Sequence, residues 1–122
     1  MKICIIGGGS IGKRHLNNLN NLKLDLFCLK RSYSKTFEKN FNCKVITCQS
    51  EIISNNISSI VVCSPTSLHI DWIKFAYKFS LNIFIEKPLV SSQNQLSQIA
   101  NLKFDNSVSF IGYMLRYHKP II

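Results

Sequence analysis

Apolar residues along this chain fall into short runs separated by longer stretches with helical spacing. The runs are rich in Ile, Val and Phe and have the length of β-strands. We expect strands at Lys2–Ile6, Leu24–Leu29, Lys44–Thr47, Ser59–Cys63, Asn82–Ile85 and Ser107–Tyr113. The stretches between them predict helices at Ser10–Asn21, Ser34–Asn40, Gln49–Asn55, Thr66–Phe79 and Ser92–Leu102. Strict alternation of strand and helix predicts an α/β fold, a doubly wound parallel sheet.

The predicted helix at Thr66–Phe79 has the clearest periodicity. Its apolar residues recur close to every 3.6 positions, at Ile70, Ile73, Phe75, Ala76 and Tyr77. Thr66 or Ser67 stands where a side chain can cap the start of this helix. A serine also stands at the start of the first, second and fifth predicted helices.

Length and composition indicate one folded domain. The chain has 122 residues, of which 46% are apolar and 11% aromatic. No apolar run approaches the ~20 residues of a membrane span. The apolar stretch after Met1-Lys2 stops at Gly7, well short of the roughly 7–15 residues of a signal core. We expect a soluble cytoplasmic protein with no membrane partner.

The chain is basic, with 15 Lys and Arg against 6 Asp and Glu and a formal charge of +9. This excess would supply the electrostatic term for binding nucleic acid. The basic residues are scattered singly or in pairs, however, without the aromatic interleaving of an RNA-binding sheet. We therefore expect no nucleic-acid partner and a basic surface that suits anionic small molecules.

The five cysteines contain no Cys-x-x-Cys pair. Cys4, Cys28 and Cys63 fall inside apolar runs, where a reduced cysteine packs as a small hydrophobe. Cys43 and Cys48 are isolated from each other and from any histidine in the sequence. The pattern predicts core packing for the first three and no metal site.

A glycine-rich loop follows the first predicted strand and leads directly into a helix. Gly7, Gly9 and Gly12 have the Gly-x-Gly-x-x-Gly spacing, which permits a tight turn, a bare backbone beside a pyrophosphate and close helix packing. The N–H groups of Ser10 and Ile11 would then face the phosphates at the helix N-terminus. A glycine-rich turn without a ligand is the alternative, which the strand-loop-helix context disfavours.

Lys30 and Arg31 stand where dinucleotide-binding proteins carry an acid for the ribose 2′-hydroxyl. An acid would repel a 2′-phosphate, whereas this basic pair attracts one, and Ser32 and Ser34 offer hydroxyl donors. The sequence thus favours NADP(H) over NAD(H). An ordinary solvated pair after a strand is the alternative.

The segment "FIEKPLV" (residues 84–90) ends a buried strand in two opposite charges and a proline. Ligands of open parallel sheets bind at the carboxyl ends of the strands, which is where Glu86 and Lys87 stand. A surface ion pair followed by a strand-ending Pro88 is the alternative.

Several segments together resemble the glucose–fructose oxidoreductase / inositol dehydrogenase / rhizopine-catabolism oxidoreductases (Gfo/Idh/MocA). They are "IGGGSIGKRH" (residues 6–15), "VVCSPTSLH" (61–69), "IEKPL" (85–89) and "GYMLRYHKP" (112–120). The glycine loop fits any Rossmann-type protein, whereas Glu-Lys-Pro downstream of Ser-Pro-x-x-x-His is far more selective. Their order and spacing cover essentially the whole chain.

The resemblance implies roles for particular residues. Lys87 would lie beside the nicotinamide and the reacting oxygen of the substrate, where a cation stabilises developing negative charge. Glu86 would hold that ammonium and help to contact the cofactor. Ser64, Pro65 and His69 would lie along the ribose and nicotinamide side, although a structural role for His69 is equally open. We expect a structural role for His15.

The resemblance also implies a domain organisation. Residues 1–118 would form a Rossmann-type NAD(P)-binding domain and residues 119–122 the start of the connection to a C-terminal α+β domain that is absent. In the family that domain supplies the catalytic histidine and its accompanying acid, and no residue here matches them. We expect the chain alone to be inactive and its parent to be an oxidoreductase acting on a sugar-like substrate.

Two further expectations follow from this organisation. The alternative to an oxidoreductase half is a catalytically inert dinucleotide-binding module that acts with a partner chain. The segment Ser109–Leu115 would be exposed without a second domain, so that a homo-oligomer is possible. Arg116 and His118 receive no chemical role.

Overall fold

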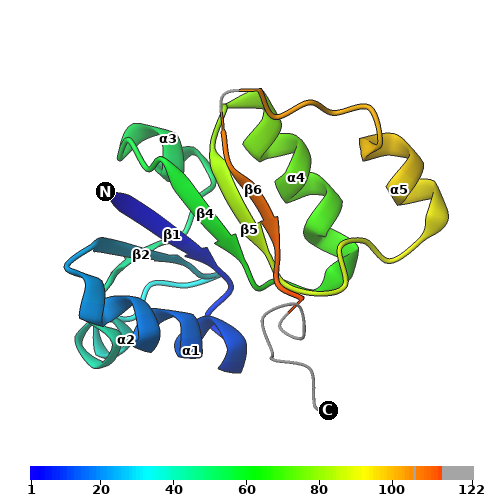
Figure 1. The fold of residues 1–122 in the computed structure, drawn as a ribbon. Coiled ribbons are helices and arrows are strands. Elements are labelled where there is room, and N and C mark those ends of the chain that lie inside the picture. Colours follow the sequence, from blue (N-terminus) through cyan, green and yellow to red (C-terminus); the bar gives the residue numbers. More distant parts are fainter. Residues whose placement is uncertain (106, 114–122) are drawn as a thin grey trace, which may run out of the picture.

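The protein is described here from a computed structural model, in which residues 1–105 and 107–113 are described. Its centre is a 6-stranded sheet with the strand order β3-β2-β1-β4-β5-β6. All neighbouring strands pair in parallel. The strands are β1 (Lys2–Ile6), β2 (Asp25–Leu29), β3 (Lys44–Ile46), β4 (Ser59–Val62), β5 (Asn82–Ile85) and β6 (Ser109–Ile111) (Figure 1). The predicted doubly wound parallel sheet is confirmed.

The strands match their predicted positions and differ at their ends. β1 and β5 have the predicted limits, whereas β2, β3 and β4 are each one residue shorter. β6 loses two residues at each end because it is an edge strand that pairs only with β5, from Ile83↔Ser109 to Ile85↔Ile111. An edge strand is only as long as its single partner allows.

The helices alternate with the strands as predicted, with two breaks. They are α1 (Ser10–Leu19), α2 (Lys35–Phe41), α3 (Ser50–Ser54), α4 (His69–Lys78) and α5 (Gln93–Ile99). A 3₁₀ turn, η1 (Asn20–Leu22), ends the first predicted helix, and another, η2 (Thr66–Leu68), precedes α4. The fourth helix therefore begins at His69 and not at Thr66.

Helix caps agree with the prediction at two places and disagree at two. Ser34 caps α2 and Ser92 caps α5, because their hydroxyls accept the N–H groups of Phe37 and Gln95. The predicted cap at Thr66 or Ser67 is wrong, since both lie inside η2 and no side chain caps that turn or α4. The N-cap of α1 is Gly9, so no side chain covers this helix start.

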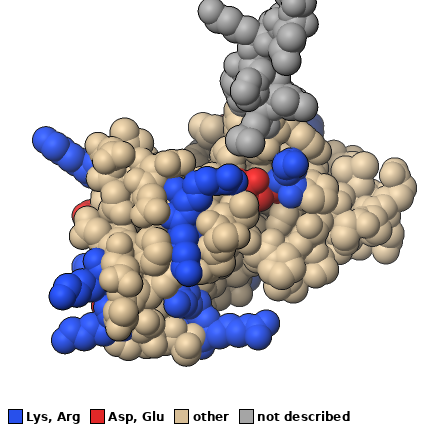
Figure 2. Space-filling view, turned by 90° about the horizontal axis from the view of Figure 1, so that it is seen from below, with Lys and Arg blue, Asp and Glu red and all other residues tan. Residues whose placement is uncertain are grey.

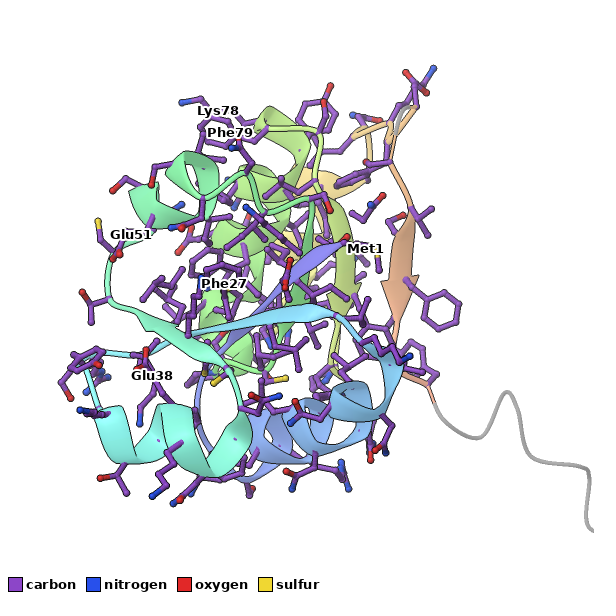
Figure 3. The ribbon with its side chains drawn as sticks, turned by 90° about the vertical axis from the view of Figure 1, so that its left-hand side faces the viewer. Met1, Phe27, Glu38, Glu51, Lys78 and Phe79 are labelled. Atoms are coloured by element: carbon purple, nitrogen blue, oxygen red, sulfur yellow. The ribbon has the colours of Figure 1, made fainter. Side chains whose placement is uncertain are left out.

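Helices cover both faces of the sheet, α1 and α2 on one and α3, α4 and α5 on the other (Figure 1). Alternate residues of a strand point to opposite faces, so each face has its own apolar core. Phe27, labelled in Figure 3, is 3% exposed and belongs to the core beneath α3 and α4. The core beneath α1 and α2 includes Ile3, Ile5, Leu16, Leu26, Cys28, Phe37, Cys43, Val45 and Val61.

Four of the five cysteines pack in these cores. Cys4 and Cys28 are fully buried and Cys63 is partly buried, which confirms their packing role. Cys43 is also buried, which sequence reasoning did not anticipate because it stands beside polar neighbours. Cys48 is exposed, and all five are free thiols.

Some of the predictions for the C-terminal end concern described residues and others do not. Within the segment expected to be exposed, Phe110 is 36% and Tyr113 41% exposed, whereas Gly112 is buried. Self-association stays a prediction. Arg116, His118 and the predicted boundary after residue 118 lie outside the described residues. Within the described ranges, none of the helices has both the length and the apolar character needed to span a membrane.

Candidate dinucleotide site

The glycine loop joins β1 to α1 and depends on Gly7. Gly7 has a φ of +104°, a conformation that side chains disfavour, and a Cβ here would lie 3.2 Å from the carbonyl oxygen of Cys63. Its N–H donates to the Leu29 carbonyl over 3.2 Å. The turn is thereby held against the ends of both neighbouring strands.

The other two motif glycines provide space. A Cβ on Gly12 would collide with the carbonyl oxygen of Gly7, so only glycine lets α1 start this close to the loop. A Cβ on Gly9 would meet nothing within 4 Å, because this side of the loop faces open space. The helix leaves the N–H groups of Ser10 and Ile11 without an intrahelical acceptor, as a phosphate site requires.

A cavity of about 610 Å³ opens beside this loop at the carboxyl edge of the sheet. Its lining brings together Gly7, Gly8, Gly9, Lys30, Arg31, Ser32, Thr47, Gln49, Cys63, Ser64, Pro65, Leu68 and Trp72. The Ser64 hydroxyl is buried and, among the described residues, has no hydrogen-bond partner. An orphaned hydroxyl beside a bare glycine loop fits a polar ligand such as a dinucleotide, and the volume lies within the usual range for ligand sites.

Lys30 and Arg31 both line the cavity but differ in their surroundings. The Lys30 stem lies under Gly8, where a Cβ would be 3.1 Å from its Cδ. Its ammonium lies 3.8 Å from the centroid of the Phe37 ring on α2. Arg31 and Ser32 are exposed, whereas Ser34 uses its hydroxyl as the α2 cap.

The end of β5 carries Glu86, Lys87 and Pro88 to the same edge of the sheet. β5 pairs with β4 up to Val62↔Ile85, and the Glu86 N–H donates to the Val62 carbonyl over 3.0 Å. Lys87 is exposed on the turn that follows, and its peptide bond to Pro88 is cis. Neither Glu86 nor Lys87 lines the 610 Å³ cavity. They follow β5, which pairs with β4, the strand that leads to Ser64 in the cavity.

Glu86 has a different partner from the one expected. Its Oε1 lies 2.6 Å from Nε2 of His15 on α1, and each side chain is about one-fifth exposed, at 20% and 21%. Within residues 1–105 and 107–113 no ion pair joins Glu86 to Lys87. The expectation that Glu86 holds the Lys87 ammonium therefore needs correction. Two adjacent residues of a chain leaving a strand point in different directions.

His69 is 1% exposed and ties two loops together. Its Nδ1 lies 2.9 Å from the Pro88 carbonyl oxygen and 3.3 Å from that of Leu89, while Nε2 lies 2.9 Å from that of Ser64. Both ring nitrogens thus face the backbone. This geometry favours the structural role for His69. The residue holds together the two loops beside the site and does not line the cavity.

Sequence reasoning missed several cavity residues. Leu68 and Trp72 come from η2 and α4, and Thr47 and Gln49 from the loop after β3. The usable signal was position, since each follows the carboxyl end of a strand or lies in the helix after it. Trp72 is the single tryptophan of the chain, so its fluorescence reports on this cavity.

The surroundings of the cavity are basic, and the Cys63 thiol in its lining is protonated. Figure 2 shows Lys and Arg side chains spread over the lower side of Figure 1, around a small acidic area. Burial raises the pKa of Cys63 to about 12, with Glu86 and Cys28 raising it further and Arg14 opposing them. Cys63 therefore contributes a neutral surface to the cavity. The described residues include no group of three or more His, Cys, Asp or Glu suited to a metal.

Comparison with known proteins identifies the family of this chain. The pattern of the oxidoreductase family with an NAD-binding Rossmann fold (GFO_IDH_MocA) matches residues 1–112. The chain belongs to this family and corresponds to its NAD-binding Rossmann domain. It is 31% identical over 120 residues to the uncharacterised oxidoreductase YrbE of Bacillus subtilis (strain 168), covering 93% of this chain and 35% of YrbE.

Solved structures show the same fold. The myo-inositol dehydrogenase of Lactobacillus casei, in complex with NAD(H) and myo-inositol, has a TM-score of 0.84 at 22% identity, over 98% of this chain and 38% of that one. KijD10, a 3-ketoreductase of Actinomadura kijaniata in complex with NADP and TDP-benzene, has a TM-score of 0.82 at 19% identity, over 97% and 38%. The chain thus spans little more than a third of the length of these proteins.

Proposed function

We propose that this chain is the NADP(H)-binding domain of an oxidoreductase that transfers a hydride between the nicotinamide and a hydroxyl or carbonyl carbon of a sugar-like substrate. One observation carries the proposal. The bare glycine loop, Arg31 and the orphaned Ser64 hydroxyl line one cavity, and Lys87 stands on the adjacent strand end. The substrate class is supported by family membership and by the relative that binds myo-inositol.

The residues at the end of β2 support the preference for NADP(H). Arg31 and Ser32 line the cavity, and Lys30 brings a second positive charge to the same end. An arginine can bind a phosphate with two N–H donors, and residues 30–34, directly after β2, contain no acid that would repel the 2′-phosphate. One protein of similar fold has been solved with NAD(H) and another with NADP. The affinity of this chain for each dinucleotide therefore tests the preference.

Lys87 is assigned the reacting end of the site. The bound dinucleotide would supply the hydride chemistry, and the role of Lys87 is to orient the substrate oxygen and stabilise negative charge on it. Its exposure on the turn after β5 leaves the ammonium accessible to a substrate. Proton transfer is not assigned to Lys87, because the family resemblance places it in the second domain.

Titration of the chain with NADPH and NADH, followed by Trp72 fluorescence, tests the cofactor proposal. We expect NADPH to bind at least about tenfold more tightly, the effect of roughly 1.4 kcal/mol from the phosphate contact. Equal affinity, or tighter NADH binding, would overturn the preference. Failure of both to bind would overturn the dinucleotide site itself.

The reaction is tested separately, with the protein purified in the form in which the cell makes it. We expect NADPH consumption with keto sugars, or NADP⁺ reduction with polyols, and loss of either activity in Lys87→Met. Tight NADPH binding without turnover of any sugar or polyol would instead favour an inert dinucleotide-binding module acting with a partner chain. Strong salt-dependent retention on DNA would favour nucleic-acid binding.

A further inference from the structure

His15 lies at the edge of the apolar stripe of α1, beside the residues that pack on the sheet. Gly12 and Leu16 are buried, and His15 is half-buried between these two positions in sequence. Its ring meets the Phe84 ring of β5 edge-on, at 5.5 Å between centroids and 64° between planes. In the sheet, β4 lies between β1 and β5. The His15 side chain therefore connects α1, which follows β1, to β5, the second strand from β1.

The Glu86 carboxylate occupies a narrow space between α1 and β6. Oε1 lies 2.6 Å from His15 Nε2. On the other side stands Gly112, whose Cβ, if present, would lie 3.4 Å from Glu86 Oε2 and 3.0 Å from the Phe84 ring. The absent side chain at Gly112 makes room for both, so the carboxylate has few alternative positions.

The turn that carries Lys87 is thus held on both sides. Before Lys87, the Glu86 N–H bonds to Val62 and its carboxylate to His15. After Lys87, the Pro88 and Leu89 carbonyls face the buried His69 ring. The Lys87 side chain itself is exposed, so its direction is set by these flanking contacts and not by burial.

We propose that His15 is a positioning residue for Lys87 that acts through Glu86. The same helix begins at the glycine loop, so the His15–Glu86 bond fixes the Lys87 turn relative to the place where α1 would hold the phosphates. Displacements of about 1 Å at a reacting group are costly, which gives this bond a functional consequence. The inference rests on the proposed function, because it takes Lys87 as the group beside the nicotinamide.

The test observes Lys87 directly and needs no substrate. Reductive methylation with carbon-13 labels the lysines and keeps their charge, and the Lys87 signal is assigned by its absence from Lys87→Arg. NADP⁺ is then added to the wild-type chain, His15→Ala, His15→Gln and the control Asn18→Ala, which changes an exposed residue of the same helix. Trp72 fluorescence gives the Kd for each variant.

We expect NADP⁺ to move the Lys87 signal in the wild type and in Asn18→Ala, through the ring current of the nicotinamide. In His15→Ala the movement falls to less than about half, while the Kd stays within about threefold, because His15 positions the turn and does not bind the phosphates. His15→Gln restores the movement, since its amide can donate to Glu86.

The outcomes separate this inference from the proposed function. A full Lys87 response in His15→Ala overturns the positioning role and leaves the proposed function standing. A His15→Gln variant that behaves like His15→Ala also overturns the positioning role through Glu86. The ring contact of His15 with Phe84, and not its bond to Glu86, would then hold the Lys87 turn. A wild-type chain that binds NADP⁺ without any Lys87 response refutes the proposed place of Lys87 itself.

Discussion

The ammonium of Lys30 lies 3.8 Å from the centroid of the Phe37 ring. Because of this contact, Lys30 and Arg31 have different surroundings, although they are adjacent in the sequence. Lys30 is committed to the face of an aromatic ring that is itself only 7% exposed, whereas Arg31 is exposed at the cavity. The 2′-phosphate contact is therefore expected chiefly from Arg31.

This division predicts unequal effects of substitution on cofactor affinity. Arg31→Ala should raise the Kd for NADPH about tenfold and leave that for NADH nearly unchanged. Lys30→Met keeps the stem beneath Gly8 and should raise the Kd for NADPH less. Trp72 fluorescence titrations measure both values. An equal loss of NADH and NADPH affinity in Arg31→Ala would show that it does not read the phosphate.

The motif glycines should separate folding from binding. Gly12→Ala collides with backbone, so we expect a loss of about 1–3 kcal/mol in the free energy of unfolding. Gly9→Ala meets open space and should leave stability within about 0.5 kcal/mol while it abolishes NADPH binding. Urea unfolding and NADPH titration of both variants check this. Normal NADPH affinity in Gly9→Ala would show that no ligand approaches the loop there.

His69 should be required for stability. Replacement by Leu leaves the Ser64 and Pro88 carbonyls without the ring nitrogens, and we expect a loss of about 2–4 kcal/mol in the free energy of unfolding. Asp71→Ala, an exposed change on the same helix, is the matched control. Both are compared by urea unfolding. A His69→Leu variant as stable as the control would contradict the tie between the two loops.

The cysteines should react in a defined order with iodoacetamide. Hydrogen bonding to Ser50 lowers the pKa of the exposed Cys48, so its thiolate forms first and alkylation begins there. Burial raises the pKa of Cys28 and Cys63 to about 12 and that of Cys43 to about 11. Peptide mapping by mass spectrometry after brief treatment checks the order.

The same thiols predict the alkaline limb of the stability curve. Unfolded thiols lose their protons near 9.0, whereas the folded ones keep them to about 11 or 12. The unfolded state therefore binds fewer protons above pH 9.0, and the free energy of unfolding should fall as pH rises from there. Cys28→Ala and Cys63→Ala should flatten this fall. Parallel curves for wild type and variants would show that other groups cause it.

Local sequence signals identified the elements of this fold and the type of its principal loop. Among the described residues, apolar periodicity located the strands and the α-helices, because burial of one face imposes its repeat on the sequence wherever an element packs. It failed at element ends, where hydrogen bonds to distant residues decide. The 3₁₀ turn before α4 is one case: α4 begins at His69, whose ring nitrogens contact the carbonyls of Ser64 and Pro88.

By itself, the sequence determined the alternating α/β architecture, the glycine turn and the place of Glu86 and Lys87 at a strand end. Only the tertiary structure decided that Glu86 pairs with His15, that Lys30 lies on Phe37, and that His69 supports the site from the interior. The reason is that spacing along a chain fixes repeat and direction within one element. Which side chains meet across elements depends on how the strands are ordered in the sheet and on where the glycines leave space.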